Sequence, residues 1–119
     1  MRKESFERAS CSVKCLPFKK KFYEQISKQA MGSKELCTKN DWEEYVFSPF
    51  GRDRAEAHFR WMIKIGVLRR EVDGQGLTDR VRVTPLGIEV IEQWEDEIPR
   101  AGLRERIKEN FRRHTALKY

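Results

Sequence analysis

Residues 55–91 limit the possible folds more than any other part of this sequence. Apolar side chains at helical spacing lead up to Gly66, which lies where the C-terminal cap of a helix is expected. Two strand patterns, residues 68–72 and 80–84, follow directly, and the segment between them contains the Asp73-Gly74 pair that is typical of a hairpin. Because this connection, residues 73–76, is longer than the tightest turns, we expect the hairpin to project.

A predicted helix lies on each side of this hairpin. The preceding one, residues 53–66, begins beyond Gly51 and places Ala55, Phe59 and Met62 on one buried face. In the following one, Thr84 is the expected N-cap and Pro85 the first helical residue. Its apolar face consists of Ile88, Ile91 and Trp94, and Ile98-Pro99 ends it.

Two further helices are predicted before residue 53. Apolar residues recur every four positions after Pro17, which predicts a helix that ends near Gly32. Asn40 is a suitable N-cap for a second, short helix within residues 38–50, and Pro49 would end it. The four residues of the first stripe are Phe18, Phe22, Ile26 and Ala30.

The two ends of the chain are predicted to lie outside this unit. Residues 1–15 are polar and show no clear period, so we expect a flexible N-terminal arm. Residues 99–119 contain a last helix, to about Leu117, with a narrow apolar stripe. Such a helix either packs back on the helix after Pro17 or meets its copy in a second chain. We therefore expect one domain, residues 16–98, and a homodimer through the side chains Leu103, Ile107, Phe111 and His114.

The order helix, helix, helix, hairpin, helix resembles the winged helix-turn-helix superfamily. Two stretches carry the resemblance: Ala55-x3-Phe59-x2-Met62-x3-Gly66-Val67-Leu68, and the strand-to-helix exit Val83-Thr84-Pro85-Leu86-Gly87. The resemblance implies an α+β, mainly helical fold, in which a three-helix unit carries a β-hairpin wing and an additional C-terminal helix. It also implies a transcriptional regulator that binds double-stranded DNA, with helix 53–66 in the major groove and wing 72–80 on the backbone.

The basic residues of this helix and hairpin are the candidate DNA contacts. Arginine can bind guanine through two hydrogen bonds, and lysine can neutralise phosphate. Solvated helix faces and arginine stems that cover apolar surface explain such residues equally well. Trp61, opposite the buried stripe, either lies exposed or packs on a segment outside this unit, and DNA, a partner and the last helix are its three candidate contacts. The full candidate set is Arg52, Arg54, Arg60, Trp61, Lys64, Arg69, Arg70, Arg80 and Arg82.

The charge distribution gives mixed support to DNA binding. The net charge is +6, with basic excesses in residues 1–32 and 99–119 that favour polyanions. Residues 33–68, however, contain six basic and six acidic side chains. Asp53 and Glu56 lie at or near the face of helix 53–66 that is expected to contact DNA. Residues 84–98 contain five acids and no lysine or arginine.

The main alternative is a winged helix that serves as a protein-interaction module in a larger complex, without direct DNA binding. Its contacts would be the aromatic residues Trp42, Phe50, Trp61 and Phe111, although most of these are expected in the core. RNA binding on the same basic surface is a third possibility, but the RNA-recognition strand motif is missing.

Other classes of function find little support. The three cysteines, Cys11, Cys15 and Cys37, lack the CxxC spacing of a zinc site, so we expect reduced thiols and no metal. The phosphate loop, GxSxG and HExxH motifs are missing and the two histidines, His58 and His114, are far apart, so we expect neither catalysis nor a cofactor. With no apolar run long enough for a bilayer and no signal peptide pattern, we expect a cytoplasmic protein.

Overall fold

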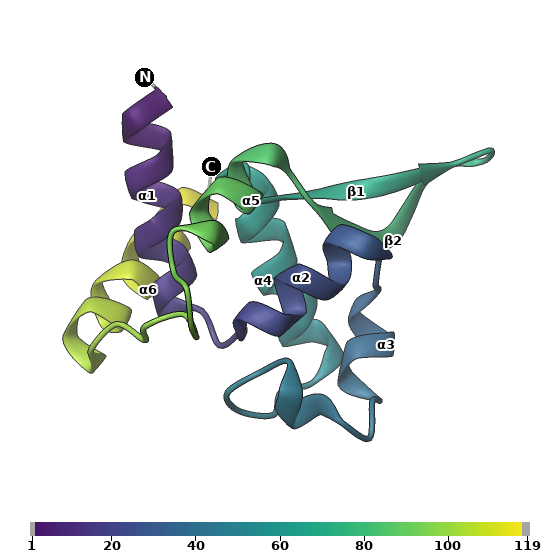
Figure 1. Ribbon diagram of the computed structural model, residues 1–119, viewed down its shortest axis with the longest axis horizontal. Helices are drawn as coiled ribbons and strands as arrows, with labels where there is room; N and C mark the ends of the chain where they lie inside the picture. Colours follow the sequence, from purple (N-terminus) through teal and green to yellow (C-terminus); the bar gives the residue numbers. More distant parts are fainter. Residues whose placement is uncertain (1, 118–119) are drawn as a thin grey trace.

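The structure, a computed structural model, describes the backbone of residues 2–117 and the side chains of residues 3–113. It is an α+β fold in which one antiparallel hairpin projects from a group of helices (Figure 1). The elements are α1 Arg2–Cys15, α2 Lys20–Lys28, α3 Ser33–Cys37, a 3-10 turn Trp42–Glu44, α4 Arg52–Lys64, β1 Leu68–Asp73, β2 Gly76–Val83, α5 Pro85–Glu92 and α6 Leu103–Leu117.

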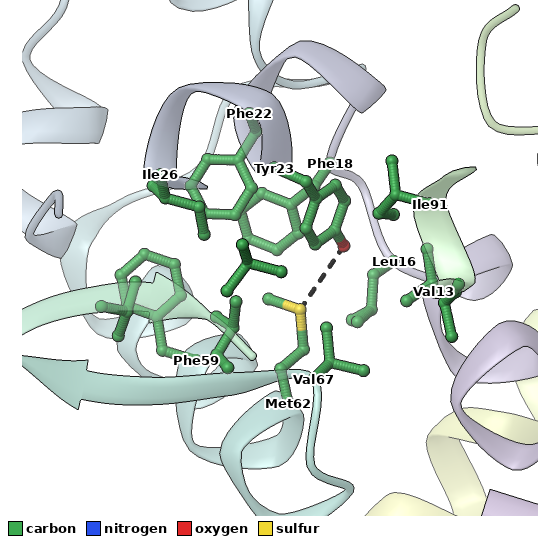
Figure 2. Packing of buried hydrophobic residues seen from close by; sticks show 14 of the residues in the cluster. Val13, Leu16, Phe18, Phe22, Tyr23, Ile26, Phe59, Met62, Val67 and Ile91 are labelled. Atoms are coloured by element: carbon green, nitrogen blue, oxygen red, sulfur yellow. Dashed lines mark hydrogen bonds between the residues drawn. The ribbon is translucent and has the colours of Figure 1, made fainter. Parts of the chain in front are cut away.

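The core lies between α2, α4 and the base of the hairpin. The stripe predicted after Pro17 is buried, with Phe18, Phe22 and Ile26 fully inaccessible. The rings of Phe18 and Phe22 face Phe59 of α4. The Tyr23 hydroxyl donates a hydrogen bond to the Met62 sulfur at 3.4 Å (Figure 2). The predicted α4 stripe is therefore confirmed as the core face of that helix.

The passage from α4 through the hairpin to α5 follows the predicted pattern closely. The backbone of Gly66 has φ +89°, a conformation that other residues rarely adopt, and Val67 and Leu68 are buried directly after it. The Thr84 side chain caps α5 by accepting a hydrogen bond from the Gly87 backbone amide at 3.1 Å, and Pro85 is the first helical residue. Both the cap and the helix start were correctly predicted.

The hairpin is longer and its turn tighter than expected. Asp73 pairs with Gly76, so the turn itself contains only Gly74 and Gln75, and the prediction of a longer connection is wrong. The Asp73 carboxylate accepts a hydrogen bond from the Gln75 amide at 2.7 Å, which stabilises this two-residue loop. The hairpin extends well beyond the helices (Figure 1).

The predicted second helix within residues 38–50 is wrong. Only Trp42–Glu44 forms a single 3-10 turn, and the backbone of Tyr45, which follows it, is still helical. Val46 pairs with Phe18 in an isolated antiparallel bridge. The Phe47 amide donates to the Pro17 carbonyl, and the Lys19 amide donates to the Tyr45 carbonyl, each at 2.8 Å. This pairing ends the helical turn after Tyr45, and the β-branched side chain of Val46 favours it.

A short helix that the sequence did not reveal, α3, takes the place of the predicted one. The helix after Pro17 is also shorter than expected, since α2 ends at Lys28 and Met31 pairs with Val81 of β2. The Met31 amide donates to the Val81 carbonyl at 3.2 Å, and the Val81 amide donates back at 2.9 Å. This pairing fastens the base of the hairpin to the segment before α3.

The expectation of a flexible arm for residues 1–15 is also wrong. That segment is α1, and Ala9 and Val13 are fully buried against the rest of the fold. The predicted last helix exists but begins at Leu103 instead of near Pro99, and it packs beside α1 (Figure 1). The buried Ser12 hydroxyl donates to the Glu109 carboxylate and so joins the two helices.

Candidate nucleic-acid interface

Helix α4 presents cations on the side that faces away from the core. Ala55, Phe59 and Met62 are completely buried, which turns the opposite side of the helix outward. The predicted contact residues Arg52, Arg54, Arg60 and Lys64 are all exposed on this helix. Asp53 is exposed among them and lowers the positive charge of the surface.

The predicted contact residues of the hairpin differ from one another in their ionic partners. Arg69 is exposed, whereas Arg70 is half-buried and pairs with Glu56 of α4 at 2.8 Å. Arg70 also donates to the Asp79 carbonyl at 2.8 Å. The pair thus holds the hairpin against α4, so this arginine has a structural role that competes with any DNA contact.

Two more arginines of the hairpin share one carboxylate. Arg82 lies 2.8 Å from Glu71 and Arg80 lies 3.8 Å from it, across the two strands. Such partly exposed pairs contribute little stability, but they offset the charge that a phosphate would otherwise meet. Of the four predicted hairpin residues, Arg69 is exposed and takes no part in these ion pairs, which makes it the favoured candidate for a backbone contact.

The carboxylate of Glu56 is stabilised in its charged form. Burial raises the pKa of this carboxyl, but the hydrogen bond and charge of Arg70 oppose that effect, and the pKa lies below its ordinary value. The sequence analysis treated Glu56 as an acid that opposes DNA binding. Its pairing with Arg70 instead makes it part of the connection between α4 and the hairpin.

The prediction that Trp61 contacts DNA does not agree with its position. The side chain is only 4% exposed, and it lines a groove whose other wall belongs to α6. Trp61 thus belongs to the hydrophobic core and shares this groove with the last helix.

The groove beside Trp61 brings together arginines that the sequence analysis did not single out. It separates α4 from α6, has a volume of about 720 Å³ and is lined by Arg54, Arg100, Arg106 and Arg113. The basic excess of residues 99–119 was visible in the sequence. Its placement against α4 was not, because it depends on the path of the chain between α5 and α6.

His58 faces the same groove and stays uncharged. Arg113 Nη1 lies 2.7 Å from His58 Nδ1, a distance at which the guanidinium donates to the neutral ring. Burial, followed by the positive charges of Arg113 and Arg54, lowers the pKa of His58 to about 3. The groove therefore derives its positive charge from arginines and not from histidine.

The predicted dimer residues lie on the accessible part of α6. Leu103, Ile107 and Phe111 are 67%, 61% and 76% exposed, respectively. The side chain of His114 lies outside the described residues. Exposed apolar groups of this kind on one helix are compatible with the predicted interface, which stays a prediction.

The described residues give no indication of a metal site. Within residues 3–113, no group of three or more His, Cys, Asp or Glu side chains is arranged to hold an ion. Burial, together with the negative charge of Glu109, raises the pKa of Cys15 to about 11, which disfavours the thiolate that a metal or an electrophile requires. No helix in the described part of the chain is long and apolar enough to cross a bilayer.

The chain belongs to the Npun_F0494-like family, whose model it matches over residues 1–113. The family description names no activity. No curated protein and no solved structure matches the chain. The function therefore has to be argued from the geometry of α4, the hairpin and α6.

Proposed function

We propose that this member of the Npun_F0494-like family is a winged helix that binds double-stranded DNA as a transcriptional regulator. In this proposal α4 is the recognition helix and the β1–β2 hairpin is the wing. The observation that carries it is the row of exposed cations on the outer side of α4, directly followed in the chain by the exposed Arg69 and the projecting hairpin (Figure 1).

The connection between the hairpin and the helices supports this proposal. The backbone pairing of Met31 with Val81 and the ion pair of Arg70 with Glu56 both fix the hairpin relative to α4. A fixed orientation matters because a recognition helix and a wing must reach the same duplex together. The hairpin base is thus positioned by α4 and by the segment before α3.

The side of α4 that meets DNA is narrower than the sequence analysis expected. Helix α6 flanks α4 on the side of Trp61, so a duplex would approach from the side of Asp53, Arg60 and Lys64. These three residues share one side because they are spaced by seven and four positions. Arg52 and Arg69 then lie at the two ends of the surface, placed for phosphate contacts.

Binding of a mixed-sequence duplex, followed by fluorescence anisotropy at low and moderate salt, tests the proposal. The double variant Arg60→Gln/Arg69→Gln should weaken binding about tenfold or more, and the slope of log affinity against log salt should fall by about two. The matched control, Arg8→Gln/Arg104→Gln, removes two exposed arginines from α1 and α6 and should change affinity much less. Equal losses in both variants would contradict a defined interface.

The interaction-module alternative rests on one observation, the exposure of Leu103 and Ile107 on α6. Of the four aromatic residues first considered for it, Trp61 is buried and Trp42 and Phe50 pack against the core, whereas Phe111 on α6 is 76% exposed. An apolar interface weakens little with salt, whereas phosphate contacts weaken steeply. No duplex binding at low salt would therefore favour this alternative.

A further inference from the structure

The groove between α4 and α6 contains hydrogen-bond donors that the protein itself does not use. Among the described residues, Trp61 Nε1, Arg100 Nε and Arg106 Nε are inaccessible to solvent and have no acceptor. All three residues line this groove. Buried donors are normally paired, because a buried donor without an acceptor loses the hydrogen bond that it makes to water in the unfolded chain.

The charge of the groove is also uncompensated. Four arginines line it, and Glu109 is the only carboxylate among its described lining residues. That carboxylate already accepts the Ser12 hydroxyl and lies 3.4 Å from Arg112. The groove therefore has an excess of positive charge that its own acid does not neutralise.

The arginines act on one another as neighbouring like charges do. Burial and the charge of Arg106 lower the pKa of Arg100. Burial and the charges of Arg54 and Arg60 lower the pKa of Arg113, against the opposing effect of Glu109. An anion held between these side chains would relieve the repulsion among them.

Part of the remaining groove lining is apolar. Pro17, Pro49 and Phe50 line it on one side, and Leu103 and Ile107 line it on α6. Arg100 lies over the Phe47 ring, 4.8 Å from its centroid, which fixes one of the cations. The volume of about 720 Å³ is of the size that holds a small organic molecule.

We propose that this groove binds a small organic anion, with a phosphate or carboxylate group on the arginines and an apolar body on Leu103, Ile107 and Phe50. The charged group would be recognised by Arg100, Arg106 and Arg113. The groove lies on the α6 side of α4, and it shares Arg54 with the proposed DNA surface but does not include Arg60 or Arg69.

The test uses three probes and the ¹⁵N-labelled full chain. 1-Naphthyl phosphate and 1-naphthoate combine an aromatic body with either charged group, and inorganic phosphate lacks the body. The indole N–H signals of the three tryptophans report binding, with the Trp61 signal assigned from Trp61→Phe. Titration should shift the Trp61 signal with one of the two naphthyl anions, and inorganic phosphate should bind at least tenfold more weakly. The better naphthyl anion identifies the charged group.

Variants then locate the site. Arg106→Gln should raise the dissociation constant of the bound naphthyl anion about tenfold, because it removes a charge-assisted hydrogen bond. Arg104→Gln, on the same helix but outside the groove lining, should leave it unchanged. If Trp61→Phe does not fold, the comparison of Arg106→Gln with Arg104→Gln still decides whether the anion binds in the groove.

Three results would overturn the proposal. The first is no shift of any indole signal at millimolar probe, and the second is an equal effect of Arg104→Gln and Arg106→Gln. The third is duplex DNA that shifts the Trp61 signal and depends on Arg106, which would assign the groove to nucleic acid. Because the DNA test uses Arg60 and Arg69, the two proposals can fail independently.

Discussion

The neutral state of His58 couples the stability of this fold to pH. In the folded chain its pKa is about 3, against 6.5 for the free side chain. As pH falls below about 6.5 the unfolded chain takes up a proton that the folded chain refuses, so stability is complete above that pH and is lost below it. Burial of the ring is the main cause of the lowered pKa, and the positive charges of Arg113 and Arg54 add to it.

His58→Gln should flatten the pH dependence of unfolding. Between pH 7.5 and pH 5 the wild type should lose about 1–2 kcal/mol more unfolding free energy than the variant, after allowance for partial exposure of the ring. Denaturant unfolding at the two pH values measures this difference, and glutamine retains an oxygen that can accept from Arg113. Identical pH profiles for the two proteins would show that His58 titrates normally in the folded chain.

At the scale of elements, Gly87 determines how closely α5 approaches the end of α4. A Cβ placed on Gly87 would lie 2.5 Å from the Val67 carbonyl oxygen and 2.6 Å from Val83 Cγ2. Neither neighbour is the end of a flexible side chain, and the Val67 carbonyl accepts the Thr84 amide at 2.9 Å. This junction joins α4, the hairpin and α5, so added volume there must displace backbone.

Gly87→Ala should therefore lower the unfolding free energy by about 2–3 kcal/mol. Gly102→Ala is the matched control, because a Cβ there meets no atom within 4 Å, and it should change stability by less than about 0.5 kcal/mol. Thermal or denaturant unfolding of both variants measures the contrast. A Gly87→Ala protein as stable as the control would mean that α5 can shift without cost.

The same elements show which parts of the fold the sequence could predict. The path from α4 through the hairpin to α5 was predictable because each step has a local signal, namely Gly66, Asp73-Gly74 and the Thr84-Pro85 cap. The α1 helix also has a signal, because Phe6, Ala9, Val13 and Leu16 recur at spacings of three, four and three, but polar neighbours hide it.

The remaining differences come from contacts between distant segments. The bridge between Val46 and Phe18 joins segments that are far apart in the sequence, and no local pattern specifies that partner. The cationic groove likewise depends on residues 100–113 returning to α4. The four exposed cations of α4 could be predicted from helical spacing alone, whereas the burial of Trp61 could not, because that side chain packs into a core formed by distant segments.

At the scale of the whole molecule, α6 connects the two proposed sites. It closes one side of α4, leaves the Asp53, Arg60 and Lys64 side open, and supplies Arg106 and Arg113 to the groove. The groove and the DNA surface thus lie on different sides of one helix. A second chain on α6 would cover the apolar rim of the groove, so dimerisation and binding of the organic anion should compete.

The predicted homodimer follows from the exposure of Leu103 and Ile107, 67% and 61%, since apolar groups clustered on one helix favour contact with a partner. A two-fold dimer through α6 would present two copies of α4 to one duplex.

Sedimentation velocity should show a dimer for the wild type and a monomer for Ile107→Glu, because a carboxylate cannot be buried there without a counter-charge. Leu77→Glu, which changes an equally apolar residue that is 77% exposed on the hairpin, should remain dimeric. Two results would contradict the predicted dimer. One is a wild type that is monomeric at every concentration, and the other is a dimer that Leu77→Glu dissociates and Ile107→Glu does not. Either result would leave the groove as the only proposed role of α6.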